Sequence, residues 1–521
     1  MSEKMNVLFF ITDQQRADHL GCAGNPILKT PNLDRLASEG VRFTNAYVAN
    51  PTCMPNRCAI MTGQYPNMCV RAFSVNLDSA DSPTFSETLR KEDYVSKAIG
   101  KMHFNFWSNP VGETKSVEQV SRWISKKERK KLKENFPKPW NGFDEVELIS
   151  GHGDLCVGHY SEWLEERAPQ YANEIYKKMA TILDHTYRES ITPEEYYPTT
   201  YCTERAVDFL EKHARGEHGD KPFLLKVSYP DPHHPCTPPG RWGEMYNPDE
   251  IELPKSFNDK ENIKKHKYIG PRSDHPQLGK MLFHTTTEEE ARNFTAKTYG
   301  MVSMIDDSVG QILAALEKLG MADNTMIVYT SDHGDMMGDH GMILKGFMSF
   351  NGITNVPLIW KVPGITPKGA VSDSLVSAVD LAPTILNLSN INKEKIPLDM
   401  QGIDIIPILK DPSVKLRDSC LIEIDEADIR MKDQSLQNNP LSKLFYNSAL
   451  RVKSVVTERY TLTVYNNLPG YGDLFDRKND PDELNNLWYS NPELRLELLD
   501  KLVHEIISAQ SLYPKKQGSG G

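Results

Sequence analysis

The sequence lacks two features that would mark a membrane protein or a nucleic-acid binder. No stretch approaches the roughly 20 consecutive apolar residues that a membrane span needs. Basic residues are not in excess, because 60 Lys and Arg stand against 71 Asp and Glu in 521 residues, a formal net charge of −11. A general nucleic-acid binder needs an excess of cationic side chains to neutralise phosphates. We therefore expect neither a membrane nor a nucleic-acid partner.

Paired cysteine motifs are also missing. The eight cysteines are irregularly spaced and never form Cys-x-x-Cys, so the sequence indicates neither a zinc ribbon nor a dense disulfide scaffold. The apolar run at 6–12 is too short for the hydrophobic region and cleavage site of a secretory signal peptide. These features lead us to expect a cytoplasmic protein with reduced thiols.

Two continuous apolar runs, at 6–12 and 325–330, predict strands that are buried on both faces. A helical pattern over 302–319 precedes the second run, and this order is typical of α/β proteins. Polar pairs follow both runs directly, Asp13-Gln14 after the first and Asp332-His333 after the second. Ligands bind at the carboxyl ends of strands in open α/β sheets, so both pairs are candidate site residues.

The sequence changes character after about residue 415. The segment 454–465 is typical of paired strands, and 492–509 of a terminal amphipathic helix. We predict a larger catalytic domain over 1–414, a smaller C-terminal α+β domain with an antiparallel sheet over 415–514, and a tail over 515–521.

The two polar pairs together form a candidate metal site. Asp13, Gln14, Asp332 and His333 would offer three oxygen ligands and one imidazole. Oxygen-rich coordination favours calcium or magnesium over structural zinc. Taken alone, each pair fits equally well as a cap for a following helix, as Asp often is.

A cysteine motif lies between the two pairs, at Cys53-x-Pro55-x-Arg57. A thiol at a helix N-terminus with an arginine nearby has a lowered pKa and is reactive. A short motif of this kind also occurs by chance, and an isolated cysteine is commonly a small buried hydrophobe. The motif by itself leaves both interpretations open.

Five motifs in a fixed order give the chain a family resemblance. They are Asp13-Gln14, Cys53-x-Pro55-x-Arg57, Gly100-Lys101-Met102-His103, Pro232-His233-His234-Pro235, and Asp332-His333-Gly334 through to Lys345. Together they resemble the formylglycine-dependent (type I) sulfatases of the alkaline phosphatase superfamily, whose relatives include arylsulfatases, choline sulfatases and phosphonate monoester hydrolases. The resemblance implies an αβα sandwich with a large mixed, mostly parallel sheet, followed by the smaller C-terminal domain.

The resemblance also implies a role for each motif residue. Cys53 would be oxidised after synthesis by a formylglycine-generating maturation enzyme, and the hydrate of formylglycine would be the nucleophile. Asp13, Gln14, Asp332 and His333 match the metal ligands of one divalent cation, with Ca2+ preferred and Mg2+ or Mn2+ as alternatives. Arg57 and Lys101 match residues that hold the hydrate and the metal-side oxygens. His103 matches the residue that helps to expel sulfate. His233 and Lys345 match residues that contact the sulfuryl and leaving-group oxygens.

We therefore expect a metal-dependent hydrolase of a small aryl, alkyl or sugar sulfate. Gln14 stands where many sulfatases have a second aspartate and resembles the phosphonate monoester hydrolases, so a phosphonate monoester or phosphodiester hydrolase is the alternative. A non-catalytic binder of sulfated ligands, with unmodified Cys53, is the alternative of another class. The sequence is compatible with a homo-oligomer and does not fix the oligomeric state.

Overall fold

A nine-stranded sheet crosses the centre of the part of the chain that the computed structural model describes, which is residues 4–70, 77, 81–105, 116–179, 186–274, 279, 283–425 and 451–510. Its strands lie in the order β12-β2-β11-β9-β1-β7-β4-β5-β6. Their bounds are β1 (Asn6–Thr12), β2 (Val41–Phe43), β4 (Val95–Lys101), β5 (Glu145–His152), β6 (Leu155–Gly158), β7 (Phe223–Ser228), β9 (Thr325–Ser331), β11 (Leu358–Lys361) and β12 (Ala370–Ser372). The five central strands, from β9 to β5, are parallel to one another, whereas β11 and β6 pair antiparallel with the outer two of them.

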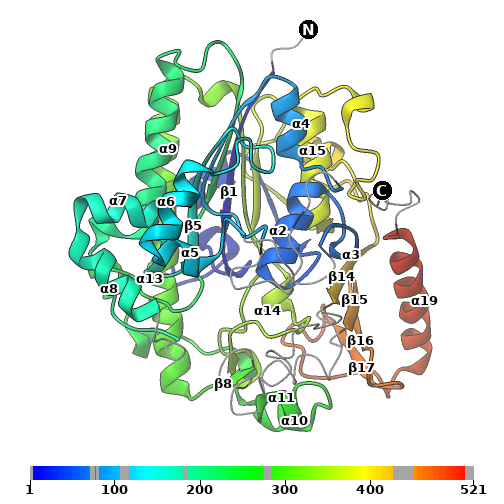
Figure 1. The fold of residues 1–521 in the computed structure, drawn as a ribbon. Coiled ribbons are helices and arrows are strands. Elements are labelled where there is room, and N and C mark those ends of the chain that lie inside the picture. The colour runs from blue at the N-terminus through cyan, green and yellow to red at the C-terminus, as the bar shows by residue number, and fades with distance from the viewer. Residues whose placement is uncertain are drawn as a thin grey trace, which may run out of the picture.

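Helices cover both faces of this sheet (Figure 1). The described helices are α1 (Pro31–Ser38), α2 (Cys53–Thr62), α3 (Pro66–Cys69), α4 (Phe85–Lys91), α5 (Val120–Ile124), α6 (Lys126–Glu134), α7 (His159–Arg167), α8 (Pro169–Met179), α9 (Pro198–Ala214), α10 (Lys260–Lys265), α11 (Gly270–Ser273), α13 (Glu288–Lys318), α14 (Asn351–Thr354), α15 (Leu381–Leu388), α16 (Ile406–Lys410) and α19 (Pro492–Ser508). None of them combines the length and the apolar character that crossing a bilayer requires.

Strand β1 shows why the sheet has two apolar faces. All seven of its residues are buried, and successive side chains of a strand point to opposite faces. Val7, Phe9 and Ile11 pack in the core that includes α2, α4 and α15. Leu8 and Phe10 pack in a second core, with α1, α9 and α13. The predicted α/β sandwich with a mixed, mostly parallel sheet is confirmed.

A separate four-stranded antiparallel sheet follows in the C-terminal part. Its strands are β14 (Ser419–Asp425), β15 (Arg451–Thr457), β16 (Tyr460–Tyr465) and β17 (Gly472–Asp476), paired in that order. Helix α19 packs against β14, β15 and β16, and both lie to one side of the large sheet (Figure 1). This is the antiparallel sheet expected after residue 415. The domain boundary at 414 stays a prediction, and the predicted tail at 515–521 lies outside the described residues.

Two short strand pairs complete the described strands. They are β3 (Ala46–Tyr47) with β13 (Val376–Ser377), and β8 (His284–Thr285) with β10 (Met342–Ile343). The helical pattern predicted over 302–319 belongs to a longer helix, because α13 already begins at Glu288, where Thr287 caps it by accepting from Glu290 N. The predicted apolar pattern covers only the C-terminal half of α13, whose buried apolar residues from Ile305 to Leu316 share a core with the large sheet.

Candidate active site

The carboxyl ends of five adjacent parallel strands meet at one edge of the large sheet, and each strand brings polar side chains there. In spatial order they are Asp332 and His333 after β9, Asp13 and Gln14 after β1, His233 beyond β7, Lys101 and His103 at the end of β4, and His152 at the end of β5. This shared edge is where ligands bind in open α/β sheets. Parallel pairing therefore brings together residues that are hundreds of positions apart.

The candidate metal ligands converge as the sequence predicts. Ligand atoms of Asp13, Cys53, Asp332 and His333 all lie within 4.8 Å of one another, and all four residues are buried. His333 Nε2 is 3.4 Å from Asp13 Oδ1 and 3.6 Å from Asp332 Oδ1. Asp13 Oδ1 has no hydrogen-bond partner. A buried carboxylate oxygen without a partner is costly, so this group of atoms fits a bound divalent cation.

The side-chain amide of Gln14 is held in one orientation. Its Nε2 donates to Asp335 Oδ2 at 2.6 Å, which fixes the direction of the amide. Its Oε1 is buried without a hydrogen-bond partner. Asp335 in turn accepts from the backbone N–H groups of Met337 and Leu344. Asp335 therefore orients Gln14 so that a neutral oxygen, the kind of ligand that Ca2+ and Mg2+ take, is left available.

The tautomer of His333 also suits a metal ligand. Its Nδ1 lies 2.9 Å from the carbonyl oxygen of Gly334, so Nδ1 carries the proton and donates to that oxygen. Nε2 then presents its lone pair on the side of Asp13 and Asp332. Metal-binding histidines commonly use a backbone carbonyl in this way. Asp13, Gln14, Asp332 and His333 thus offer three oxygens and one nitrogen.

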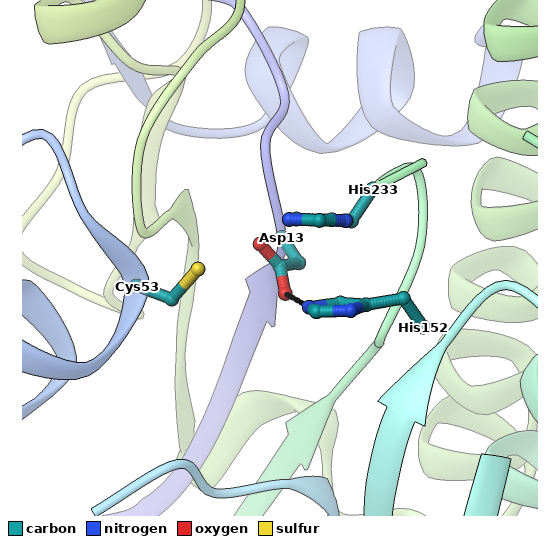
Figure 2. A group of neighbouring side chains, drawn as sticks. All are labelled: Asp13, Cys53, His152 and His233. Carbon is teal, nitrogen blue, oxygen red and sulfur yellow. Dashed lines mark ion pairs between the residues drawn. The ribbon is translucent and has the colours of Figure 1, made fainter. Parts of the chain in front are cut away.

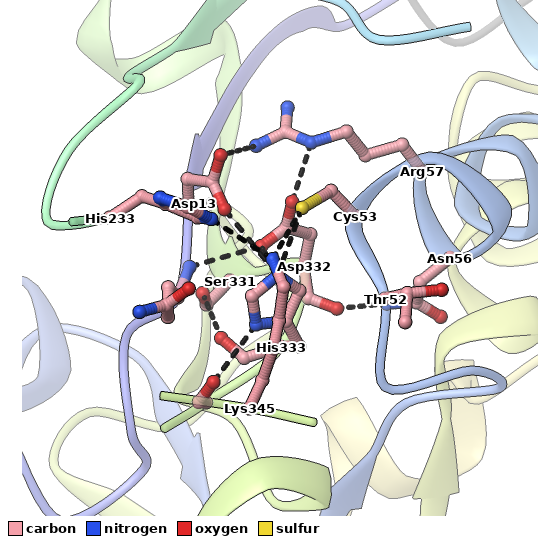
Figure 3. A network of polar contacts seen from close by, with 12 residues as sticks. Asp13, Thr52, Cys53, Asn56, Arg57, His233, Ser331, Asp332, His333 and Lys345 are labelled. Atoms are coloured by element: carbon pink, nitrogen blue, oxygen red, sulfur yellow. Dashed lines mark hydrogen bonds and ion pairs between the residues drawn. The ribbon is translucent and has the colours of Figure 1, made fainter. Parts of the chain in front are cut away.

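Cys53 is the first residue of α2 and is buried. Its Sγ lies 2.8 Å from Lys345 Nζ and 3.1 Å from His333 Nε2 (Figure 3). Burial and the Asp13 carboxylate raise its pKa, but the ammonium groups of Lys101 and Lys345, together with His333, outweigh them and lower the pKa of the thiol. The structure therefore places this cysteine at a helix N-terminus among positive groups, where a side chain is reactive.

Arg57 lies one helical turn after Cys53 and joins three strand ends. Its Nε donates to Asp332 Oδ2 at 2.6 Å, and its NH1 donates to the Lys101 carbonyl oxygen at 3.0 Å and to Ser228 Oγ at 2.7 Å. The side chain is almost fully buried. The Asp332 pKa is held well below its ordinary value, because Arg57, His333 and Lys101 outweigh the effect of burial. Arg57 thus keeps the carboxylate of Asp332, a predicted metal ligand, ionised and fixed.

Lys101 contacts Asp13 at the end of β4, and His103 follows two residues later. The Lys101 ammonium donates to Asp13 Oδ2 in a very short contact. His103 has a left-handed backbone, with φ 53°, and the backbone N–H groups of residues 103, 104 and 105 all donate to the buried carboxylate of Glu118, at 2.5, 2.8 and 2.6 Å. Burial, Lys101 and Arg57 lower the pKa of His103 well below its ordinary value.

His233 and Lys345 form a pair on the opposite side of the thiol. Lys345 Nζ is 3.0 Å from His233 Nε2, and His233 Nδ1 is 2.5 Å from the carbonyl oxygen of His234. The negative charges of Cys53, Asp13 and Asp332 outweigh burial and raise the pKa of Lys345. Lys345 is therefore a charged donor and His233 accepts at Nε2. His234 instead contacts Gln14 Nε2, at 3.2 Å.

His152 is a residue of this site that the sequence motifs did not indicate. Its ring stacks on that of His233 with centroids 3.5 Å apart and planes 9° apart, and its Nε2 is 2.8 Å from Lys101 Nζ. Figure 2 shows the two rings lying parallel beside Asp13. The only sequence signal is a histidine between two glycines at the end of a strand. The structure thus brings all ten predicted site residues to one strand edge and adds His152.

Comparisons with known proteins agree with this picture. A family model described as Sulfatase matches residues 5–391. An arylsulfatase of Clostridium perfringens (strain 13 / Type A) is 28% identical over 427 residues, which are 80% of this chain and 80% of that protein. The solved phosphonate monoester hydrolase of Agrobacterium radiobacter has a TM-score of 0.75 and 24% identity, and the match covers 97% of this chain and 96% of the other.

A second solved structure is that of BT4656 in complex with its substrate D-glucosamine-2-N,6-O-disulfate. It has a TM-score of 0.69 and 20% identity, and the match covers 99% of this chain and 100% of the other. At these identities the two structural matches speak for the fold, and they confirm the predicted alkaline-phosphatase-like architecture.

Proposed function

This chain belongs to the sulfatase family and is an enzyme that hydrolyses sulfuric esters, and we propose that it cleaves a small organic sulfate with a formylglycine nucleophile made from Cys53. The observation that carries the proposal is the position of the Cys53 side chain. It lies at the N-terminus of α2, between the Lys345 ammonium and the metal-ligand group. An attacking oxygen on this side chain would be surrounded by positive charge, which activates a nucleophile.

Fixed positive groups lie on both sides of the proposed reaction centre. Sulfuryl transfer develops negative charge on the nonbridging oxygens and on the leaving oxygen, and preorganised cations in a buried site stabilise that charge. Arg57 and Lys101 are fixed on the Asp13 side, and Lys345 is fixed beside His233. A divalent cation, when bound by the four predicted ligands, supplies Lewis acidity at the same oxygens.

The formylglycine hydrate carries two hydroxyl groups on one carbon, and each has a use. One hydroxyl loses its proton to water and attacks sulfur, and the ester bond to the leaving oxygen breaks. The leaving oxygen takes its proton from the Lys345 ammonium, which is a general acid in this role. A base then removes the proton of the second hydroxyl, the carbon–oxygen bond to sulfate breaks, and the aldehyde forms again. We assign this second step to His103, because it matches the family residue that helps to expel sulfate.

The test compares two substrate classes on protein whose Cys53 is fully modified. We expect faster turnover of 4-nitrophenyl sulfate than of a 4-nitrophenyl phosphonate monoester, because Lys101 and His103 match the sulfatase residues that hold the hydrate and help to expel sulfate. Negligible sulfatase turnover by the modified protein would exclude the proposed reaction. A screen of aryl, alkyl and sugar sulfates then identifies the alcohol part of the substrate.

One observation favours phosphonate monoester or phosphodiester hydrolysis as a second candidate. Gln14 is neutral, so the metal group carries one negative charge less than a group with an aspartate at that position. A phosphonate monoester and a sulfate monoester both carry one negative charge, and a single site can stabilise both. Faster turnover of the phosphonate in the comparison above would support this candidate. Membership in an enzyme family sets aside the alternative of a non-catalytic binder.

Three further proposals come from the sequence. Maturation requires a formylglycine-generating enzyme, which coexpression with and without that enzyme tests. The protein works in the cytoplasm, which cell fractionation tests. The chain divides into two domains after residue 414, which limited proteolysis tests. The expected metal remains Ca2+, with Mg2+ and Mn2+ as alternatives.

A further inference from the structure

His152 lies at the tip of a hairpin that reaches into the active site. It is the last residue of β5, and β6 returns antiparallel after a two-residue turn, with His152 paired to Leu155. Its side chain is 22% exposed, whereas those of Asp13 and Lys101 are fully buried. His152 therefore stands at the rim of the site, between the buried charges and solvent.

Three residues of the proposed machinery lie against His152, and one of them is Asp13, whose Oδ2 is 3.6 Å from His152 Nε2. Lys101 Nζ can only donate a hydrogen bond, so His152 Nε2 accepts from it at 2.8 Å. The third contact is the flat stack on His233, which covers one face of that imidazole. One side chain thus links the Lys101 side of the site to the His233 and Lys345 side.

A second metal ion is a less suitable explanation of this cluster. Ligand atoms of Asp13, Cys53, His152 and His233 do lie within 4.8 Å of one another. The Lys101 ammonium, however, contacts both Asp13 Oδ2 and His152 Nε2. It already supplies positive charge to Asp13 Oδ2 and takes up the lone pair of His152 Nε2, so these two atoms have a partner without a second cation. A positioning role for His152 agrees with these contacts.

The hairpin is fixed against the segment that carries His233. A Cβ atom at Gly153 would lie 2.4 Å from the carbonyl oxygen of Pro235 and 2.8 Å from Thr237 Oγ1, so only glycine allows this approach. Asp154 N donates to Thr237 Oγ1 at 3.0 Å. The Asp154 carboxylate pairs with Arg188. The stack of His152 on His233 is therefore built into the backbone contact between the two segments.

We propose that His152 is a positioning residue for sulfuryl transfer. It holds Lys101 in place by accepting a hydrogen bond from its ammonium group. It also holds the His233 ring by stacking on it, so that His233 Nε2 can accept from Lys345 and orient it. The proposal rests on the proposed function for its kinetic consequences. Its two contacts have separate effects. Loss of the ring would disturb the leaving-group side, while loss of the acceptor would disturb the Asp13 side.

Two substitutions separate these contacts. His152→Phe keeps a flat ring but removes the acceptor, and His152→Gln keeps an acceptor but removes the ring. For a series of aryl sulfates, we expect His152→Gln to steepen the dependence of kcat/KM on the leaving-group pKa, because Lys345 is less well placed to protonate poor leaving groups. We expect His152→Phe to keep the wild-type slope and to lower kcat/KM about tenfold for every substrate.

Glycine variants give a matched backbone control. Gly153→Ala should steepen the slope as His152→Gln does, because the new methyl group pushes the hairpin away from Pro235. Gly240→Ala has a similar positive φ, 49° against 52°, but its Cβ would meet nothing within 4 Å. It should keep the wild-type slope. The proposal would be overturned if both His152 variants had the wild-type kcat/KM and the wild-type dependence on leaving-group pKa. It would also be overturned if every variant kept the wild-type dependence and showed only a lower Tm.

An NMR measurement tests the positioning role without turnover. Because the two rings stack with centroids 3.5 Å apart, the His152 ring should shift the ring resonances of His233 in 15N-histidine-labelled protein. We expect that shift to be lost in His152→Gln and largely kept in His152→Phe. If the wild-type protein hydrolyses no aryl sulfate, the proposed function fails while this spectrum still decides the position of His233. Identical His233 resonances in wild type and His152→Gln would overturn the inference.

Discussion

Lys345 Nζ lies 2.8 Å from Cys53 Sγ, although 292 residues separate the two in the chain. Cys53 reaches this point from the N-terminus of α2, and Lys345 from the segment that follows β9 and β10. The same ammonium is 3.0 Å from His233 Nε2 and 2.9 Å from His333 Nε2. The thiol position is thus where the proposed general acid Lys345, the predicted metal ligand His333 and a helix N-terminus meet.

Cys53→Ala should abolish turnover and leave metal binding intact. The nucleophile is lost, and losses of at least about 1,000-fold in kcat are common in such variants. The predicted metal ligands come from the ends of β1 and β9 rather than from α2. Steady-state kinetics and calorimetric titration of Ca2+ measure the two effects. Cys58→Ala on the same helix is the control and should stay active, whereas near-normal turnover by Cys53→Ala would contradict the mechanism.

Asp335→Asn should weaken cation binding although Asp335 is not among the predicted metal ligands. Asp335 Oδ2 accepts from Gln14 Nε2, and Oδ1 accepts from two backbone N–H groups. The Asn oxygen would remain with the backbone donors, so its NH2 group would face Gln14 and turn that amide around. We expect about a 10- to 100-fold loss of Ca2+ affinity in chelator-stripped protein.

A surface pair provides the control for that variant. Asp307 also accepts from a glutamine, Gln311, but on the exposed side of α13. Asp307→Asn should leave Ca2+ affinity unchanged. Equal affinities of Asp335→Asn and wild type would mean that Gln14 does not present its oxygen to the metal.

Glu118→Gln should slow the release of sulfate more than its transfer to the enzyme. Glu118 holds the three backbone N–H groups that fix the left-handed turn at His103. A glutamine has one acceptor oxygen and one donor group, so it cannot satisfy all three donors. We expect a burst of alcohol release followed by slow turnover, with the sulfated enzyme visible by mass spectrometry. A variant without a burst and without accumulated intermediate would rule out this positioning role.

Glu118 should also give the stability a defined pH dependence. Burial outweighs the three backbone donors and raises its pKa from 4.5 to about 7. The folded state therefore binds this proton more tightly than the unfolded chain, so the stabilising contribution is full below pH 4.5 and is lost as the pH rises through 7. The difference in free energy of unfolding between the wild type and Glu118→Gln should change by about 3 kcal/mol over this range, because only the wild type loses stability as the pH rises. Urea denaturation at several pH values measures it, and a constant difference would refute the assignment.

Much of this site could be predicted because its parts are local in the sequence. The apolar run of β1 and the polar pair after it are adjacent, and so are β9 and Asp332-His333. Arg57 follows Cys53 by one helical turn. In each case a short motif fixes both the element and the side chain, and the strand order then brings the motifs to one edge.

The positioning residues could not be predicted for the opposite reason. Glu118 acts through three backbone N–H groups, which no residue type marks in the sequence. His152 depends on the contact between Gly153 and Pro235, which are distant in the chain and touch only because β5 and β7 lie in one sheet. Asp335 was visible in the motif, but the direction of the Gln14 amide depends on a contact across two strand ends.

The mass of the peptide that contains residues 53–57 tests the central claim most directly. In protein coexpressed with a formylglycine-generating enzyme, we predict a peptide about 18 Da lighter than the thiol form, because an aldehyde replaces the thiol. Activity on 4-nitrophenyl sulfate should rise in proportion to the modified fraction. Full sulfatase activity in protein whose Cys53 is entirely unmodified would contradict the account.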